Sequence, residues 1–200
     1  MDLVLLKPGN TSLWSEDGLP ASQIEGDLYL GESDGSDSDL TGCIELVSLS
    51  YGMAQQMTTD VSNSARTSGR PTLSDVTCVK YLDRSSPNLY KHCLSGAPID
   101  DGEEPTKIYL CRNANFDEDS NNIIAPIMVL TLYNCMISSI QSQSHSNDMA
   151  TEQLMLNFTD IEWTATHQTP DAKATGNVAF AWSVARNRNY TSGAYQALRP

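Results

Sequence analysis

The stretch from Leu73 to Ile99 reads LSDVTCVKYLDRSSPNLYKHCLSGAPI, and it decides the class of fold. Its first part is rich in β-branched and aromatic residues, which favours a strand. Its second part carries the signals that begin and end a helix. Ser86 offers a hydroxyl as N-cap, Pro87 suits the first helical position, and Gly96 suits a left-handed C-terminal cap. The stretch therefore predicts a strand followed by a short helix from Pro87 to about Ser95.

The predicted helix has apolar and aromatic residues at helical spacing, which we expect to form its packing face. These residues are Leu89, Tyr90, Cys93 and Leu94. No other part of the sequence combines a start signal and a stop signal for a helix so clearly. The sequence therefore predicts one outer helix packed against a β structure.

The rest of the sequence contains segments whose apolar residues alternate or cluster as they do in strands. The candidates are Leu3 to Leu6, Asp27 to Leu30, Cys43 to Tyr51, Thr106 to Arg112, Ile123 to Ile140, Leu154 to Thr166 and Asn177 to Arg186. In the last candidate the large residues, among them Val178 and Phe180, are expected in the core and the small ones outside. About seven or eight strands joined by hairpin-like loops predict an antiparallel β-barrel or sandwich.

Three of these candidates are interpreted as single continuous strands. Cys43 to Tyr51 has apolar residues on both faces, so it is expected to need cover on both sides. Ile123 to Ile140 is a long apolar stretch whose alternation favours one long strand, and Leu154 to Thr166 alternates in the same way.

The chain is strongly acidic, and its charge is unevenly distributed. The formal net charge is −13; from Asp171 onward one acid accompanies four bases, a net of +3, so the first 170 residues carry −16. Phosphate contacts need Lys and Arg, so this charge argues against a nucleic-acid or anionic-membrane partner.

Neither a signal peptide nor a membrane span is predicted. The N-terminal apolar run is short, with Asp2 before it and Lys7 after it, which is the wrong charge order for a signal peptide. No apolar run approaches the roughly 20 residues of a membrane helix. The chain is expected to be made and folded in the cytoplasm.

The sequence has no catalytic signature, so no enzyme activity, cofactor or metal is predicted. Asp37 and Asp39 begin a segment similar to a calcium loop, but Ser48 stands where a bidentate Glu is needed. His92 and Cys93 are adjacent on the helix and therefore project in different directions. The five cysteines are widely spaced without a CxxC motif and are expected to be buried reduced thiols: Cys43, Cys78, Cys93, Cys111 and Cys135.

Four stretches of the sequence carry a family resemblance through their order and spacing. They are ESDGSDSDLTGCIELVSLSYGM (Glu32 to Met53), LSDVTCVKYLDRSSPNLYKHCLSG (Leu73 to Gly96), LMLNFTDIEWTAT (Leu154 to Thr166) and GNVAFAWSVARNRN (Gly176 to Asn189). The most specific is the pattern SDVT…KY.D..SP.L…C..G around the helix. The chain thus resembles the Hcp family, the haemolysin-coregulated proteins that form the inner tube of bacterial type VI secretion systems.

This resemblance implies a compact, tail-tube-like β-barrel with one outer helix and a protruding loop. It implies that six copies close into a ring, that rings stack into a tube, and that a contracting sheath expels the tube from the cell. The implied partners are the chain itself, the sheath, baseplate and spike proteins of the secretion machine, and effector proteins in the pore. The protein would be assembled in the bacterial cytoplasm and then secreted without a signal peptide.

The resemblance also places the protruding loop at Gln55 to Thr72, a polar segment without periodicity, where it would pack on neighbouring subunits. The expected interface residues are Val61, Asn63, Arg66, Thr67, Gly69, Arg70 and Pro71. The whole chain, 1–200, would form one tube domain with its core at about 27–189. Residues 1–26 would be a variable extension and 190–200 a flexible tail.

Two other functions remain compatible with the sequence. One is a monomeric β-sandwich binding module or adhesin that uses the acidic loop at Asp34 to Asp39. The other is a phage-like tail-tube subunit. The oligomeric state separates the first from a tube subunit, and gene neighbours separate the second.

Overall fold

A computed structural model describes residues 2–10, 13, 27–28, 38–39, 42–57, 59, 69–115, 122–168 and 174–190. Its helix is α1 (Ser86–Ser95). Its strands are β1 (Asp2–Lys7), β2 (Asp27–Leu28), β3 (Ser38–Asp39), β4 (Ile44–Leu46), β5 (Ser48–Ser50), β6 (Met53–Ala54), β7 (Thr72–Leu73), β8 (Val76–Tyr81), β9 (Thr106–Asn115), β10 (Asn122–Tyr133), β11 (Met136–Gln143), β12 (Thr151–Asn157), β13 (Asp160–Gln168), β14 (Ala174–Ser183) and β15 (Arg188–Tyr190).

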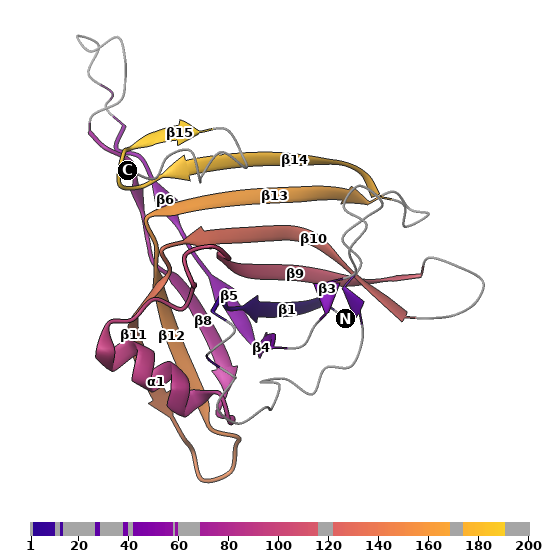
Figure 1. Ribbon diagram of the computed structural model, residues 1–200, viewed down its shortest axis with the longest axis vertical. Coiled ribbons are helices and arrows are strands. Elements are labelled where there is room, and N and C mark those ends of the chain that lie inside the picture. Colours follow the sequence, from indigo (N-terminus) through magenta and orange to yellow (C-terminus); the bar gives the residue numbers. More distant parts are fainter. Residues whose placement is uncertain are drawn as a thin grey trace.

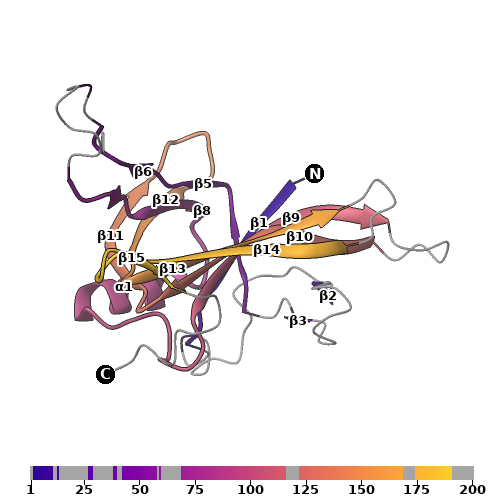
Figure 2. The same ribbon diagram turned by 90° about the horizontal axis from the view of Figure 1, so that it is seen from above.

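Two sheets form the body of the molecule (Figure 1). The large sheet has the order β15-β14-β13-β10-β9-β1-β4, with the short β2 paired to β10 and β3 paired to β2. The second sheet has the order β11-β12-β8-β5. Figure 2 shows the large sheet edge-on, running well past the second sheet. Over the described ranges the sheets form a sandwich and do not close on themselves, so the sandwich is the correct one of the two predicted architectures.

The main hydrophobic core lies between the two sheets and under the helix. Ile108 and Leu130 of the large sheet, Cys78 and Leu154 of the second sheet, and Leu89 of α1 are all fully buried in it. A smaller cluster lies on the opposite face of the large sheet and consists of Leu5, Cys43, Tyr109 and Cys111. The large sheet is therefore covered on both faces near β1 and β9.

β1 lies inside the large sheet, between β9 and β4. It pairs with β9 over its whole length and with β4 through Val4 to Leu6. The candidate strand Leu3 to Leu6 is therefore the first strand of the large sheet. Asp27–Leu28 forms the short β2, which pairs in parallel with β10 at one position and antiparallel with β3.

The three long strands predicted as continuous are each broken where the chain crosses between the sheets. The breaks lie at Val47, between β4 and β5; at Asn134 and Cys135, between β10 and β11; and at Phe158 and Thr159, between β12 and β13. The interpretation of Cys43 to Tyr51 as a strand covered on both sides was wrong. Because the chain turns at Val47, the residues on both sides of the turn point into the same core.

Each crossing shifts the alternation of core residues by one position. Along a strand the core residues follow one another every second residue. At the crossings the spacing becomes three, and the pairs are Leu46 and Leu49, Leu132 and Cys135, and Phe158 and Ile161. If the strand had kept a spacing of two, the second residue of each pair would point away from the core. The extra residue at each crossing therefore keeps the core pattern while the chain changes sheet.

The helix begins and ends close to its predicted limits, but its capping differs. Ser85 occupies the N-cap position without a side-chain cap bond, and Ser86 is already helical. Gly96 has φ 64° and ends the helix in the left-handed conformation, as predicted. Leu89 is fully buried, whereas Leu94 is 89% exposed and does not belong to the packing face.

The packing predicted for β14 was only partly correct. Trp182 packs against the core, but Val178 is 76% exposed and Phe180 is 52% exposed, while the small Ala181 and Ser183 are buried. Exposure of the large side chains rises with distance along the strand from Ser183, because β14 continues past the second sheet that would cover them (Figure 2).

The cysteines are free thiols, and four of the five are buried; Cys93 is half-buried. The prediction of buried reduced thiols is thus confirmed for Cys43, Cys78, Cys111 and Cys135. None of the helices in the described part of the chain is long and apolar enough to cross a membrane.

Candidate subunit-contact surface

The position of the outer helix depends on a buried lysine at the end of β8. The Lys80 side chain is fully buried, and its Nζ lies 2.7 Å from Glu152 Oε1 and 2.9 Å from Asp83 Oδ1. Nζ also donates hydrogen bonds to the Tyr81 carbonyl, at 2.8 Å, and to Ser86 Oγ, at 3.2 Å. The ammonium group therefore contacts four oxygen atoms, two of which belong to carboxylates.

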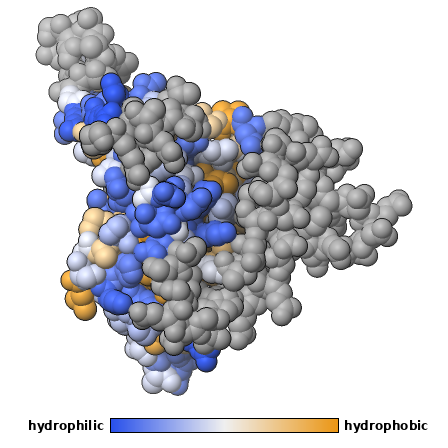
Figure 3. Space-filling model, in the orientation of Figure 1, coloured by the Kyte–Doolittle hydropathy of each residue, from blue (hydrophilic) through white to orange (hydrophobic). Residues whose placement is uncertain are grey.

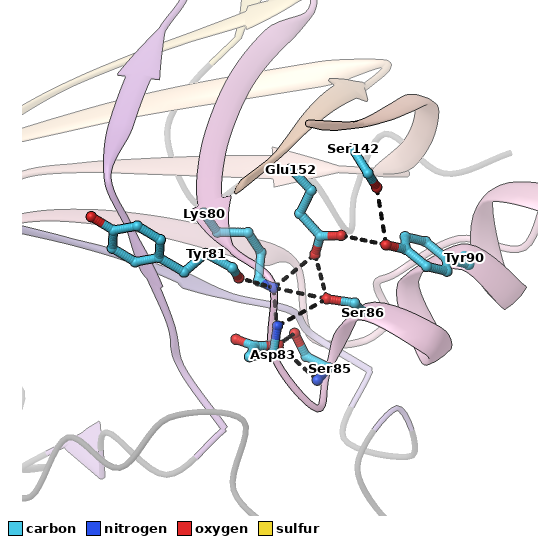
Figure 4. Close-up of polar contacts among 8 residues, drawn as sticks. All are labelled: Lys80, Tyr81, Asp83, Ser85, Ser86, Tyr90, Ser142 and Glu152. Atoms are coloured by element: carbon cyan, nitrogen blue, oxygen red, sulfur yellow. Dashed lines mark hydrogen bonds and ion pairs between the residues drawn. The ribbon is translucent and has the colours of Figure 1, made fainter. Parts of the chain in front are cut away.

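Glu152 on β12 links this lysine to the helix (Figure 4). Ser86 Oγ donates to Glu152 Oε1 at 2.6 Å, and the Tyr90 hydroxyl donates to Glu152 Oε2 at 2.7 Å. The hydroxyl oxygens of Tyr90 and of Ser142 on β11 lie 3.1 Å apart and share a hydrogen bond. A buried ion pair is tolerated only when its remaining hydrogen-bonding capacity is satisfied, and here both carboxylate oxygens are occupied.

This network holds α1 in one orientation against the core-facing side of the second sheet, because Lys80 and Glu152 share that face with the core residues Cys78 and Leu154. The residues predicted for the packing face of the helix have different surroundings, and Cys93 is half-buried. Leu89 faces inward, Tyr90 joins the network, and Leu94 faces solvent. Figure 3 shows a strongly hydrophobic area at the edge of the molecule, over the end of the helix.

The base of the predicted loop is fixed by two polar side chains. Gln55 Nε2 donates to the Gly69 carbonyl at 3.0 Å. The Arg70 guanidinium donates to the carbonyl of Val184 and, at 3.1 Å, to that of Ala185, in the turn after β14. The loop root is therefore attached to the end of the large sheet, which the sequence did not indicate because the two segments lie far apart in it.

Only part of the predicted loop interface can be placed. Gly69, Arg70 and Pro71 are described, and Gly69 and Arg70 are exposed. The other predicted interface residues, Val61, Asn63, Arg66 and Thr67, lie outside the described residues.

An aromatic surface lies where β13 and β14 extend past the second sheet. Phe180 is the cross-strand partner of Trp163, and their rings stack with centroids 5.9 Å apart. Phe180 also stacks on Trp182, at 6.4 Å. We call Val178, Phe180 and Trp163 the aromatic edge. Val178 and Phe180 are exposed there and Trp163 is half-buried, and exposed apolar groups that gather in this way are typical of protein–protein contacts.

The described residues offer little for catalysis. They contain no group of three or more His, Cys, Asp or Glu side chains that could hold a metal ion. Burial raises the pKa of Cys78 to about 12, and burial together with the nearby Cys43 raises the pKa of Cys111 to about 12. Such thiols stay protonated at neutral pH and are poor nucleophiles. Most of the acidic loop at Asp34 to Asp39 lies outside the described residues.

The sequence matches the family model described as type VI secretion system effector, Hcp, over residues 22–165. The chain belongs to the Hcp family. The resemblance inferred from the sequence is thereby confirmed. Among curated relatives, the protein hcp1 of Pseudomonas aeruginosa is 28% identical over 117 residues, which is 58% of this chain and 66% of hcp1. The match therefore spans slightly less than two thirds of that relative.

Solved structures show that this Hcp chain has the fold of its family. A type six secretion system protein superposes with a TM-score of 0.68 at 18% identity, over 95% of this chain and all of the other. Hcp1 from Salmonella typhimurium superposes with a TM-score of 0.58 at 14% identity, over 94% of this chain and 99% of the other.

Proposed function

We propose that this Hcp protein is a structural subunit of the inner tube of a type VI secretion system. In this proposal it forms hexameric rings that stack into an expelled tube, and it acts without catalysis. The match of residues 22–165 to the Hcp family carries the proposal. A likeness to solved secretion-system proteins over nearly the whole chain supports it at the level of the fold.

The aromatic edge supports a role that requires self-association. Val178 and Phe180 stay largely exposed although the register of β14 aligns them with core residues. Removing apolar surface from water is worth about 25 cal/mol per Å², so a second copy that covered these side chains would be bound favourably. Contacts between different surfaces of identical chains are heterologous, and they close into rings when the rotation between copies allows.

The loop at Gln55 to Thr72 is proposed to pack on adjacent subunits. Gln55 and Arg70 hold its root in place, so that a contact made by the loop is transmitted to the large sheet. Met53 and Met57 at the same root are exposed, and their flexible side chains suit an apolar contact.

The proposed partners outside the tube are the sheath, baseplate and spike proteins of the secretion machine. Effector proteins are the proposed cargo of the pore. The tube protein would itself leave the cell when the sheath contracts, after assembly in the bacterial cytoplasm.

Negative-stain electron microscopy of the purified protein, with a mass measurement on the same sample, tests this proposal. We expect six-fold rings with a central hole and a mass of six chains. Phe180→Ser should reduce ring formation, whereas Leu94→Ser, which changes an even more exposed apolar residue on the helix, serves as the control. A uniform monomer at high concentration and moderate salt would contradict the proposal and favour a monomeric binding module.

A further inference from the structure

The two outer strands of the large sheet carry opposite charges. β15 forms one end of the strand order and β4 the other, and among the described residues each has a pairing partner on one side only. Arg188 is exposed on β15, and Glu45 is exposed on β4. No hydrogen bond or ion pair joins either side chain to another described residue.

The surroundings of the two strands extend this difference in charge. Residues 177–190 contain Arg186 and Arg188 and no acid, and Arg70 binds the turn between β14 and β15. On β4 itself Glu45 is the one charged residue, and it is exposed between the buried Ile44 and Leu46. The β15 edge is thus basic and the β4 edge acidic, in a chain whose net charge is −13.

Arg188 and Glu45 also project from the same face of the sheet. Residues that are direct partners on neighbouring strands project from the same face of a sheet. Arg188 is the partner of Ser183, Ser183 of Asp160, and Asp160 of Tyr133. On β10, every second residue shares a face, so Val129 projects from the same face as Tyr133. Val129 is the partner of Tyr109, Tyr109 of Leu5, and Leu5 of Glu45, so Glu45 lies on this face as well. The alternation is unbroken along this route, since the bulge in the β9–β10 pairing lies between Pro126 and Met128.

The two outer strands run in the same direction. Each of the pairings that separate β15 from β4 is antiparallel, and they number six, which is even. A rotation about an axis along the strands preserves their direction. A second copy rotated in this way can therefore place its β4 beside β15 with Glu45 and Arg188 on a common face.

We propose that the Arg188 edge of one subunit docks against the Glu45 edge of the next copy of this chain, and that this charge pairing sets the head-to-tail direction of the ring. The inference rests on the proposed tube function and names the contact that orders the subunits. Opposite charges on neighbouring strands attract, whereas like charges placed there repel. The wrong arrangement, edge β15 to edge β15, brings arginines together and is disfavoured.

A charge-swap experiment tests this contact by ring formation. Arg188→Glu and Glu45→Arg, each alone, should raise the protein concentration needed for half assembly by at least about tenfold, because each places like charges at every contact. An equimolar mixture of the two variants should restore rings with equal numbers of each chain. The double variant that carries both changes should also form rings alone.

The controls separate this contact from general effects. Lys91→Glu on α1 and Asp148→Arg in the turn between β11 and β12 change exposed charges on elements that pair with neither edge strand, and both variants should assemble as the unchanged protein does. Circular dichroism shows whether each variant is folded. Single variants that assemble normally, or a mixture that fails to restore rings, would overturn the inference while leaving the tube function intact. Failure of the unchanged protein to form rings would instead overturn the tube function, and the inference with it.

Discussion

At the scale of single residues, the pair formed by Lys80 and Glu152 determines where the outer helix lies. The two residues are separated by 72 positions in the sequence, and both have fully buried side chains. Sequence patterns did not indicate this pair, because a lysine and a glutamate in half-buried strands are usually solvated. Only the pairing of β8 with β12, which sets Lys80 opposite Glu152, brings them together.

Glu152→Ala is expected to destabilise the protein by about 3–5 kcal/mol, since it leaves the Lys80 ammonium buried without its partner. Urea unfolding followed by circular dichroism measures this loss. The double variant Lys80→Met, Glu152→Leu should lose less than Glu152→Ala alone, because it removes both charges. A single variant as stable as the unchanged protein would contradict the role given to this pair.

The buried thiols should be nearly inert in the folded protein. Burial raises the pKa of Cys78 and of Cys111 to about 12, and it raises the pKa of Cys135 well above the ordinary value of a thiol. The reactive thiolate form of these residues is therefore scarce at pH 8. We expect Ellman's reagent to detect at most Cys93 in the native chain and all five thiols after unfolding. Cys93→Ser should abolish the native reaction, and fast reaction of further thiols would contradict the described burial.

At the scale of elements, the sequence predicted which residues form β structure better than where each strand ends. The helix was found because Pro87 and Gly96 mark its two ends by their backbone preferences. The crossings at Val47, Asn134 and Thr159 were missed because strand-like alternation of apolar residues is present on both sides of each crossing. The spacing of three between core residues, as from Leu132 to Cys135, was the available signal.

The exposed surface of β14 could not be predicted for a different reason. Alternation shows which residues share a face, and Val178 and Phe180 do share a face with core residues. It does not show how far the opposing sheet extends. The contact between Arg70 and the turn at Val184 was likewise hidden, because it joins segments 114 positions apart.

The helix offers a matched pair of leucines that tests its packing. Leu89→Ala should cost about 2–5 kcal/mol, because it opens a cavity under the helix at a fully buried position. Leu94→Ala should change stability by less than about 0.5 kcal/mol, since that side chain is 89% exposed. Urea unfolding of both variants measures the difference, and equal losses would show that the helix is packed otherwise.

Deleting Val61 to Pro71 should leave a folded protein that no longer forms rings or tubes. The register of β6 with β7 joins Ala54 to Thr72, so the two strands can be linked by a shorter turn. Thermal unfolding measures the retained fold, and negative-stain microscopy measures assembly. A deletion variant that assembles normally would show that the loop makes no essential subunit contact.

At the scale of the whole molecule, net charge opposes the assembly that the surface favours. Each copy carries −13, and six copies in the proposed ring would repel one another over distances that salt screens. The close contact between opposite charges at the sheet edges is screened less, because solvent is partly excluded there. Assembly is therefore a balance between long-range repulsion and short-range contact.

Ring and tube assembly should strengthen as ionic strength rises from about 0.05 to 0.3 M, since the Debye length then falls from roughly 14 to 6 Å. Mass measurements across a salt series at fixed protein concentration check this. A trend in the opposite direction would show that attraction between charges, rather than repulsion, dominates assembly.

The crossings between the sheets have a mechanical consequence. A sandwich held only by side-chain packing yields when one layer slides over the other. Here the backbone passes from layer to layer at Val47, at Asn134 and at Thr159, and the last two corners are tied by a hydrogen bond from Asn134 Nδ2 to Thr159 Oγ1. A shearing force between the two sheets is therefore carried by the covalent backbone at these crossings. A subunit pushed rapidly through a narrow opening would keep its two sheets aligned.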